Sequence, residues 1–118
     1  MDIVIHFDGS CFPNPGGKMG CGAVIERTGG SLIPSILHKL SFFKEAAPEN
    51  TNNVAEYLAL GMVLQVASTL YPKPDSITIK GDSKLVVNQM SGTWKVKEDY
   101  YVTEAYRCKA MLEQVKKN

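Results

Sequence analysis

Two short apolar stretches of the chain are each followed by an aspartate, and the rest of the sequence can be placed around them. Residues 3–7 form an apolar run typical of an interior strand covered on both faces, and Asp8 stands at its end. Residues 76–80 alternate as a strand should and lead through Gly81 to Asp82. Taken alone, either aspartate fits a simple turn. If the two strands are parallel neighbours, however, both carboxylates converge at one sheet edge, where ligand sites form.

Between these stretches the pattern predicts an antiparallel meander. Residues 9–17 are rich in Gly and Pro and are predicted to form a loop. Residues 20–26 are predicted to form a second strand, and residues 28–31 are a hairpin signal. A third strand is expected within residues 32–43, where Pro34 favours a position at the edge of the sheet.

A long helix is predicted over residues 51–70, ended by Pro72. Its apolar residues recur at helical spacing, and Glu56 is its only charged residue. With Asn53 as N-cap, Glu56 would complete a capping box, but a role as a ligand is equally compatible with the pattern. As a crossover connection, the helix makes the two aspartate-bearing strands parallel and brings Glu56 close to both aspartates.

The last third of the chain is predicted to contain two more helices. A short helix over residues 83–90 has Asp82 or Ser83 near its cap. Residues 93–97 form a basic, aromatic loop, and residues 98–117 have a helical pattern. The apolar face of this last helix consists of Tyr101, Ala105, Cys108, Leu112 and Val115.

Length and composition indicate a single domain and argue against several classes of protein, among them disulfide-framework and membrane-spanning proteins. A chain of 118 residues is predicted to be a single domain over residues 1–118. The net charge of +1 means that any binding of nucleic acid must depend on where charges are placed. Three cysteines without a CxxC pair argue against a disulfide framework and a cysteine zinc site. Without a membrane-spanning run or a signal-peptide pattern, we expect a soluble, cytoplasmic domain with no membrane partner.

The three carboxylates of Asp8, Glu56 and Asp82 predict a metal site. With no histidine or cysteine in these motifs, the oxygen ligands favour Mg²⁺, with Mn²⁺ as a substitute. Like charges held together are costly unless a cation neutralises them. Two divalent ions about 4 Å apart suit phosphoryl chemistry, because they activate water and stabilise the leaving oxygen.

Groups suited to a nucleic-acid backbone surround the predicted carboxylate cluster. Amides, hydroxyls and lysines contact phosphate oxygens and 2′-hydroxyl groups. The alternative for the loop at residues 93–97 is a solvated segment with one aromatic side chain on the core. The candidate contacts are Asn14, Thr51, Asn52, Asn53, Lys84, Trp94, Lys95 and Lys97.

In order and spacing, four motifs resemble type 1 ribonuclease H: residues 8–10, 14–16, 51–56 and 81–83. The resemblance extends from residue 2 to about residue 115. It implies an α/β fold with a mixed sheet, in which an antiparallel three-stranded meander is joined by a parallel strand after a crossover helix, flanked by helices. It also implies Mg²⁺-dependent endonucleolytic hydrolysis of the RNA strand of RNA–DNA hybrids. The motifs look most like the compact branch, which lacks a longer basic protrusion.

The resemblance also implies roles for individual residues. Asp8, Glu56 and Asp82 become catalytic metal ligands, and Thr51 becomes part of a pocket for a DNA phosphate. Lys84 stands where the family often has a glutamine that reaches the minor groove. The residues implied to contact the hybrid's backbone and 2′-hydroxyl groups are Cys11, Asn14, Asn52 and Asn53.

The sequence departs from the family at its C-terminal end. The family continues into a fifth strand and a last helix, whose start supplies a fourth acidic ligand, often after a loop histidine. This chain ends at Asn118, and its histidines, His6 and His38, are expected to pack in the core. An open sheet edge and an uncovered apolar surface then predict association, either with a second copy or with a partner chain.

Two functions therefore compete, a hybrid-specific ribonuclease and a hybrid-binding module with weak or no catalysis. The three acids favour the ribonuclease, because a pure binder would not need them. A nucleotide-binding enzyme is disfavoured, since Gly16, Gly17, Gly20 and Gly22 do not lie between a strand and a helix in dinucleotide spacing.

Overall fold

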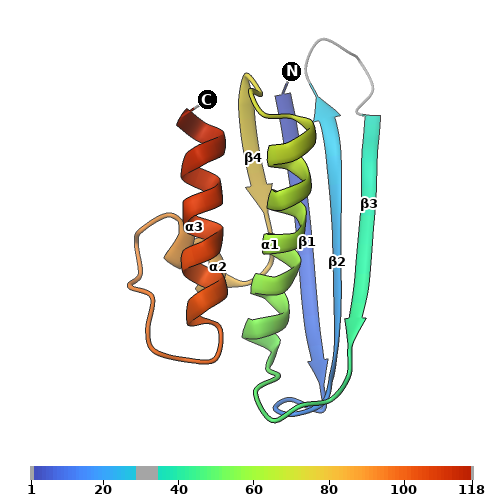
Figure 1. Ribbon diagram of the computed structural model, residues 1–118, viewed down its shortest axis with the longest axis vertical. Coiled ribbons are helices and arrows are strands. Elements are labelled where there is room, and N and C mark those ends of the chain that lie inside the picture. Colours follow the sequence, from blue (N-terminus) through green and yellow to red (C-terminus); the bar gives the residue numbers. More distant parts are fainter. Residues whose placement is uncertain (1, 29–34, 118) are drawn as a thin grey trace.

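The described strands form one mixed, four-stranded sheet (Figure 1). The computed structural model describes residues 2–28 and 35–117. The strand order is β3-β2-β1-β4, in which β1 pairs antiparallel with β2 and parallel with β4, and β2 pairs antiparallel with β3. The predicted meander with a parallel fourth strand is confirmed. The strands are β1 (Asp2–Phe12), β2 (Lys18–Thr28), β3 (Ser35–Lys44) and β4 (Ser76–Lys80).

Three helices pack on one face of this sheet. Helix α1 (Asn52–Leu70) lies across β1 and β2, and α3 (Val102–Lys117) packs against α1 (Figure 1). The short α2 (Lys84–Met90) contacts both of them near the end of β4. Within residues 2–28 and 35–117, no helix covers the opposite face, which is hereafter called the open face. None of the described helices is long and apolar enough to cross a membrane.

The burial pattern of β1 shows which face carries the core. Ile3, Ile5 and Phe7 are buried towards the helices, whereas Val4 and His6 on the open face are only half-buried. Within the described residues, helices pack on one side of this strand only, so the prediction of cover on both faces is wrong for this part of the chain. The apolar face predicted for the last helix is buried throughout, although its first residue, Tyr101, lies just before α3: Tyr101, Ala105, Cys108, Leu112 and Val115.

Two of the predicted boundaries are wrong. β1 continues to Phe12, because residues 9–12 keep pairing with β2 although glycine and serine predicted a loop there. The last helix begins at Val102 and not at residue 98, since residues 98–101 form turns. β3 is an edge strand as predicted, whereas Pro34 and most of the hairpin signal lie outside the described residues.

The first turn of α1 is capped differently from the prediction. Thr51 is the N-cap, and its Oγ1 accepts a hydrogen bond from the Val54 N–H at 3.1 Å. With the cap at Thr51 in place of Asn53, Glu56 does not stand at the third helical position, so the capping box is wrong. Ser83 caps α2 as predicted, with its Oγ 3.2 Å from the Val86 nitrogen.

Neither histidine is a core residue, contrary to the prediction. The His6 side chain is 44% exposed on the open face, with Nε2 3.8 Å from a Glu26 oxygen. His38 is half-buried, and its Nε2 lies 2.9 Å from the Tyr71 hydroxyl at the end of α1. The cysteines are buried and free, and burial raises the pKa of Cys21 to about 11.

Candidate active site

The candidate site lies where β1 continues past the end of β4. The parallel pairing ends at His6 and Lys80, so beyond that point no described strand lies beside β1 on this side. The start of α1 fills the gap: the Gly9 N–H donates to Glu56 Oε1 at 2.8 Å, and the Cys11 N–H donates to Asn52 Oδ1 at 2.7 Å. Residues four apart on a helix share a face, as alternate residues do on a strand. Two helix side chains therefore satisfy backbone groups that an adjacent strand would otherwise pair.

Glycine at position 9 allows this contact between helix and strand. A Cβ atom there would lie 2.3 Å from both the carbonyl carbon and the oxygen of Ala55, which are backbone atoms and have little freedom to move. The backbones of β1 and α1 therefore touch directly. That close approach brings Glu56 to the strand that carries Asp8.

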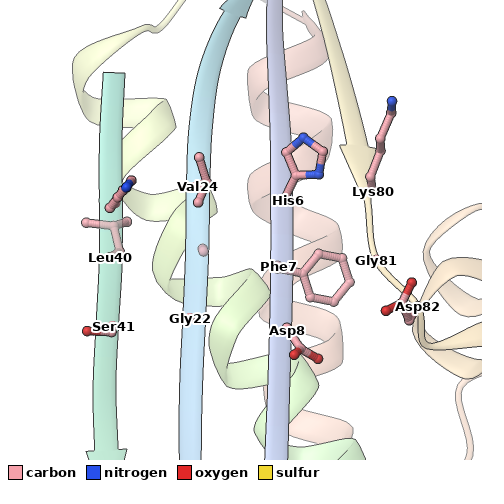
Figure 2. A pocket seen from close by; sticks show the side chains of 12 residues that line it. His6, Phe7, Asp8, Gly22, Val24, Leu40, Ser41, Lys80, Gly81 and Asp82 are labelled. Atoms are coloured by element: carbon pink, nitrogen blue, oxygen red, sulfur yellow. The ribbon is translucent and has the colours of Figure 1, made fainter. Parts of the chain in front are cut away.

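Asp8 and Asp82 approach the same space from neighbouring strands (Figure 2). Asp8 lies on β1, and Asp82 follows the end of β4 after Gly81, where a Cβ atom would lie 2.5 Å from the Phe7 ring. Both aspartates are exposed. The predicted convergence of the strands is confirmed by the β1–β4 pairing, although Asp8 lies within its strand and not at the strand's end.

Glu56 is the buried member of the three, at 7% exposure. Its Oε1 accepts from Gly9, whereas its Oε2 is buried without a hydrogen-bond partner among the described residues. Burial raises the pKa of Glu56 to about 7; the Gly9 N–H lowers it in part, and the nearby Asp8 and Asp82 carboxylates raise it further. The described groups around Glu56 therefore do not fully stabilise its ionised carboxylate beside Asp8 and Asp82.

These groups fit a hard divalent cation. The donors are all carboxylate oxygens, and one of them is buried and unpartnered. Within the described ranges, however, no three acidic, histidine or cysteine side chains are gathered closely enough to hold a metal ion as they stand. The three carboxylates are therefore neighbours that a bound cation would have to draw together.

The predicted backbone contacts lie around the start of α1. Asn14 Oδ1 accepts from the Asn52 N–H at 3.2 Å, and both residues are exposed. Asn53 and the N-cap Thr51 are half-exposed beside them. Cys11 is different, because its thiol points into the protein, with Sγ 3.4 Å from the Pro13 oxygen. The site therefore presents amides and a hydroxyl but no exposed thiol.

Sequence reasoning missed Asn50, which holds the turn after β1 against the start of α1. Its Nδ2 donates to the carbonyls of Gly17 at 2.8 Å and Glu45 at 2.9 Å, and its own carbonyl accepts from the Gly16 N–H at 2.8 Å. The side chain is almost completely buried. An asparagine just before a helix cap gives no sequence signal for this role.

Sequence reasoning also missed Gln89, a buried residue of α2 that fixes the loop over residues 93–97. Its Oε1 accepts from the Tyr57 hydroxyl at 2.5 Å, and its Nε2 donates to the Lys95 carbonyl at 3.2 Å and the Tyr101 hydroxyl at 3.1 Å. Trp94 is 45% exposed, and Lys95 and Lys97 are exposed with it. The loop thus has a buried anchor and an aromatic, basic surface.

The chain resembles known proteins over nearly its full length. A family model described as RNase H matches residues 1–117. The uncharacterized protein YpeP of Bacillus subtilis is 35% identical over 115 residues, which cover 98% of this chain and 48% of that protein. The chain spans less than half the length of the curated relatives it matches, 30% to 48%.

Solved structures resemble the fold as well. The N-terminal RNase H domain of Rv2228c from Mycobacterium tuberculosis, solved as a fusion with maltose binding protein, has a TM-score of 0.81 at 35% identity, over 96% of this chain and 75% of that one. LC11-RNase H1, isolated from compost and solved in complex with an RNA/DNA hybrid, has a TM-score of 0.75 at 32% identity, over 98% and 76%.

Proposed function

Because the chain belongs to the RNase H family, we propose that it hydrolyses the RNA strand of RNA–DNA hybrids with divalent metal ions held by Asp8, Glu56 and Asp82. The observation that carries this proposal is the buried, unpartnered Oε2 of Glu56 beside two exposed aspartates. Mg²⁺ fits these hard oxygen donors, with Mn²⁺ as a substitute. When bound, such ions supply an activated water and stabilise the leaving oxygen.

The protein's own residues contribute position and charge to this proposed reaction. Glu56 stays attached to the Gly9 N–H through one oxygen, which fixes the direction of the other. Asp8 and Asp82 are exposed on the side from which a duplex would approach. Lys84 is exposed two residues after Asp82. Groups suited to 2′-hydroxyl and phosphate contacts lie at the start of α1 and in the loop before α3: Asn14, Thr51, Asn52, Asn53, Trp94, Lys95 and Lys97.

Cleavage of three labelled duplexes tests the proposal. We expect hydrolysis of RNA in an RNA–DNA hybrid, little hydrolysis of duplex RNA and none of duplex DNA, with activity in Mg²⁺ or Mn²⁺ and none in EDTA. LC11-RNase H1, at 32% identity, has been solved with such a hybrid. Equal rates on all three duplexes would make the protein a general nuclease. Tight hybrid binding without hydrolysis would support the competing function, a binding module.

The raised pKa of Glu56 predicts how stability depends on pH and metal. Folding favours the protonated carboxyl of Glu56. The stability that this protonated group contributes is fully present below pH 4.5 and is lost as the pH rises through about 7. Mg²⁺ binds the ionised form of Glu56. Adding Mg²⁺ should therefore raise the melting temperature more at pH 8 than at pH 5.5. In Glu56→Gln, which keeps an acceptor for Gly9, both effects should shrink. Melting curves at the two pH values would show this, and an unchanged Mg²⁺ response in the variant would contradict it.

Among the residues that the structure describes, β4 has a neighbouring strand on one side only, which supports the predicted association, and we propose that its partner is a second copy of the chain. Beside β4, the last described strand on this side of the sheet, a hollow of about 200 Å³ is lined mainly by apolar side chains, among them Ile77, Ile79, Val87 and Met90. Val87 is 43% exposed. Unpaired strand edges next to apolar surface favour strand addition.

We therefore expect sedimentation to show concentration-dependent dimers whose specific activity exceeds that of the monomer. Val87→Lys should shift the protein towards monomer, whereas Thr103→Lys, at an exposed position of α3, should not. A strict monomer with full activity at every concentration would rule the association out.

A further inference from the structure

The turn between β1 and β2 packs against the start of α1, at the end of the sheet where β1 and β3 finish (Figure 1). The turn is tight: the Gly17 N–H donates to the Pro13 carbonyl at 2.8 Å, and a Cβ atom at position 17 would lie 2.2 Å from the Phe12 backbone. The turn carries the exposed Asn14. Asn52, the first residue of α1, lies directly beside it, because Asn14 Oδ1 accepts from the Asn52 N–H at 3.2 Å.

The side-chain oxygens of Asn14 and Asn52 are both bound to backbone N–H groups. Asn14 Oδ1 accepts from Asn52, and Asn52 Oδ1 accepts from the Cys11 N–H at 2.7 Å. The oxygen and the NH2 group of an amide share one plane, so a bond to the oxygen also directs the NH2 group. Both side chains are exposed, and neither NH2 group has a hydrogen-bond partner among the described residues. The two amides therefore present donors, which suit acceptor oxygens of a ligand.

The buried Asn50 fixes the turn relative to α1. Its Nδ2 donates to the Gly17 carbonyl at 2.8 Å and to the Glu45 carbonyl at 2.9 Å, so it joins the turn to the segment between β3 and α1. Its own carbonyl accepts from the Gly16 N–H at 2.8 Å, and the next residue is the N-cap Thr51. Because buried carbonyls require donors, removing this amide would leave both of its acceptors unpaired and loosen the turn.

We propose that Asn50 is a positioning residue for recognition of the RNA strand, because it holds Asn14 and Asn52 where their NH2 groups meet 2′-hydroxyl oxygens. The inference rests on the proposed function, which makes an RNA–DNA hybrid the substrate. In a hybrid only the RNA strand carries 2′-hydroxyl groups, and these accept hydrogen bonds as well as donate them. Asn50 is buried and does not touch the duplex, so it acts through the turn. The preference for hybrid over duplex DNA therefore depends on Asn50.

Binding of fluorescent duplexes in EDTA tests this role without catalysis. Asn50→Ala should weaken binding of an RNA–DNA hybrid about threefold to tenfold, roughly the effect of one hydrogen bond, and change binding of duplex DNA by less than about twofold. Asn50→Ser keeps one donor and should have an intermediate effect. The control is Val63→Ala, which removes a buried side chain from α1 away from the turn and should lower stability without changing the preference for hybrid. Melting curves set a temperature at which all four proteins are folded.

Hybrids that carry a single 2′-deoxyribose in the RNA strand locate the contact. In the wild-type protein, the 2′-deoxyribose should weaken binding at one or two neighbouring positions, and Asn50→Ala should remove most of that loss there and nowhere else. The inference is overturned if the loss is the same in both proteins, if the wild-type protein tolerates every 2′-deoxyribose, or if Asn50→Ala behaves like Val63→Ala. Each of these results can occur while the wild-type protein cleaves hybrids. A wild-type protein that binds hybrids but never cleaves them would instead refute the proposed function.

Discussion

Replacing Asp8 by asparagine is expected to reduce hydrolysis of an RNA–DNA hybrid by about three orders of magnitude or more, which corresponds to roughly 4 kcal/mol of transition-state stabilisation. The substitution keeps the size of the side chain and removes a charge proposed to hold metal. Asp8 is exposed and its backbone pairs with β2, so the fold should persist. Initial rates in Mg²⁺, measured beside melting curves, separate the loss of chemistry from unfolding.

The carboxylate of Asp8 also acts on its neighbour. Because Asp8 helps to raise the pKa of Glu56, that pKa should fall in Asp8→Asn. Glu113→Gln is the control, since it removes one negative charge from an exposed position on α3. Rates that match those of this control would remove Asp8 from the mechanism.

Alanine at position 9 should be among the most destabilising single substitutions in the protein. Its Cβ would lie 2.3 Å from the Ala55 backbone, so α1 must move away from β1. We expect a loss of about 3 kcal/mol or more in the free energy of unfolding, measured with urea, because the obstacle is backbone and cannot adopt another rotamer. Any folded fraction should hydrolyse hybrids poorly, since Glu56 would be displaced from Gly9 and Asp8.

Gly20→Ala provides the matched control for this prediction. Position 20 lies on β2, and a Cβ atom there would meet only the Phe43 side chain at 3.5 Å, an ordinary contact. We expect it to change the free energy of unfolding by less than about 1 kcal/mol. Equal effects of the two substitutions would show that the contact between β1 and α1 is not the tight one described.

The sequence predicted the described strands and the parallel pairing of the two strands that carry or lead to Asp8 and Asp82. Alternating apolar residues and the long helix between the aspartate-bearing strands left few possible connections. The second half of β1 was not predicted, since Gly9, Ser10 and Cys11 are typical of a loop. What makes them a strand is tertiary: the ladder with β2 and the hydrogen bonds from Asn52 and Glu56.

The buried polar contacts could not have been predicted from the sequence. Gln89 appears polar in a short helix, yet its amide joins Tyr57, Tyr101 and the Lys95 carbonyl inside the protein. The cap at Thr51 was missed for a related reason, because three successive polar residues each suit that position. Asn52 is occupied elsewhere, because its Oδ1 accepts from the Cys11 N–H of β1, whereas Thr51 accepts from the Val54 N–H.

The attachment of α1 to β1 has a consequence for solubility. A strand segment whose N–H groups face outwards can pair with another chain, and that exposure promotes aggregation. In this protein Asn52 and Glu56 occupy those N–H groups. The carboxylate proposed for catalysis therefore also shields a strand edge. Truncating Glu56 to alanine would leave the Gly9 N–H bare and favour fibre-like contacts, a liability that Asp8→Asn does not share.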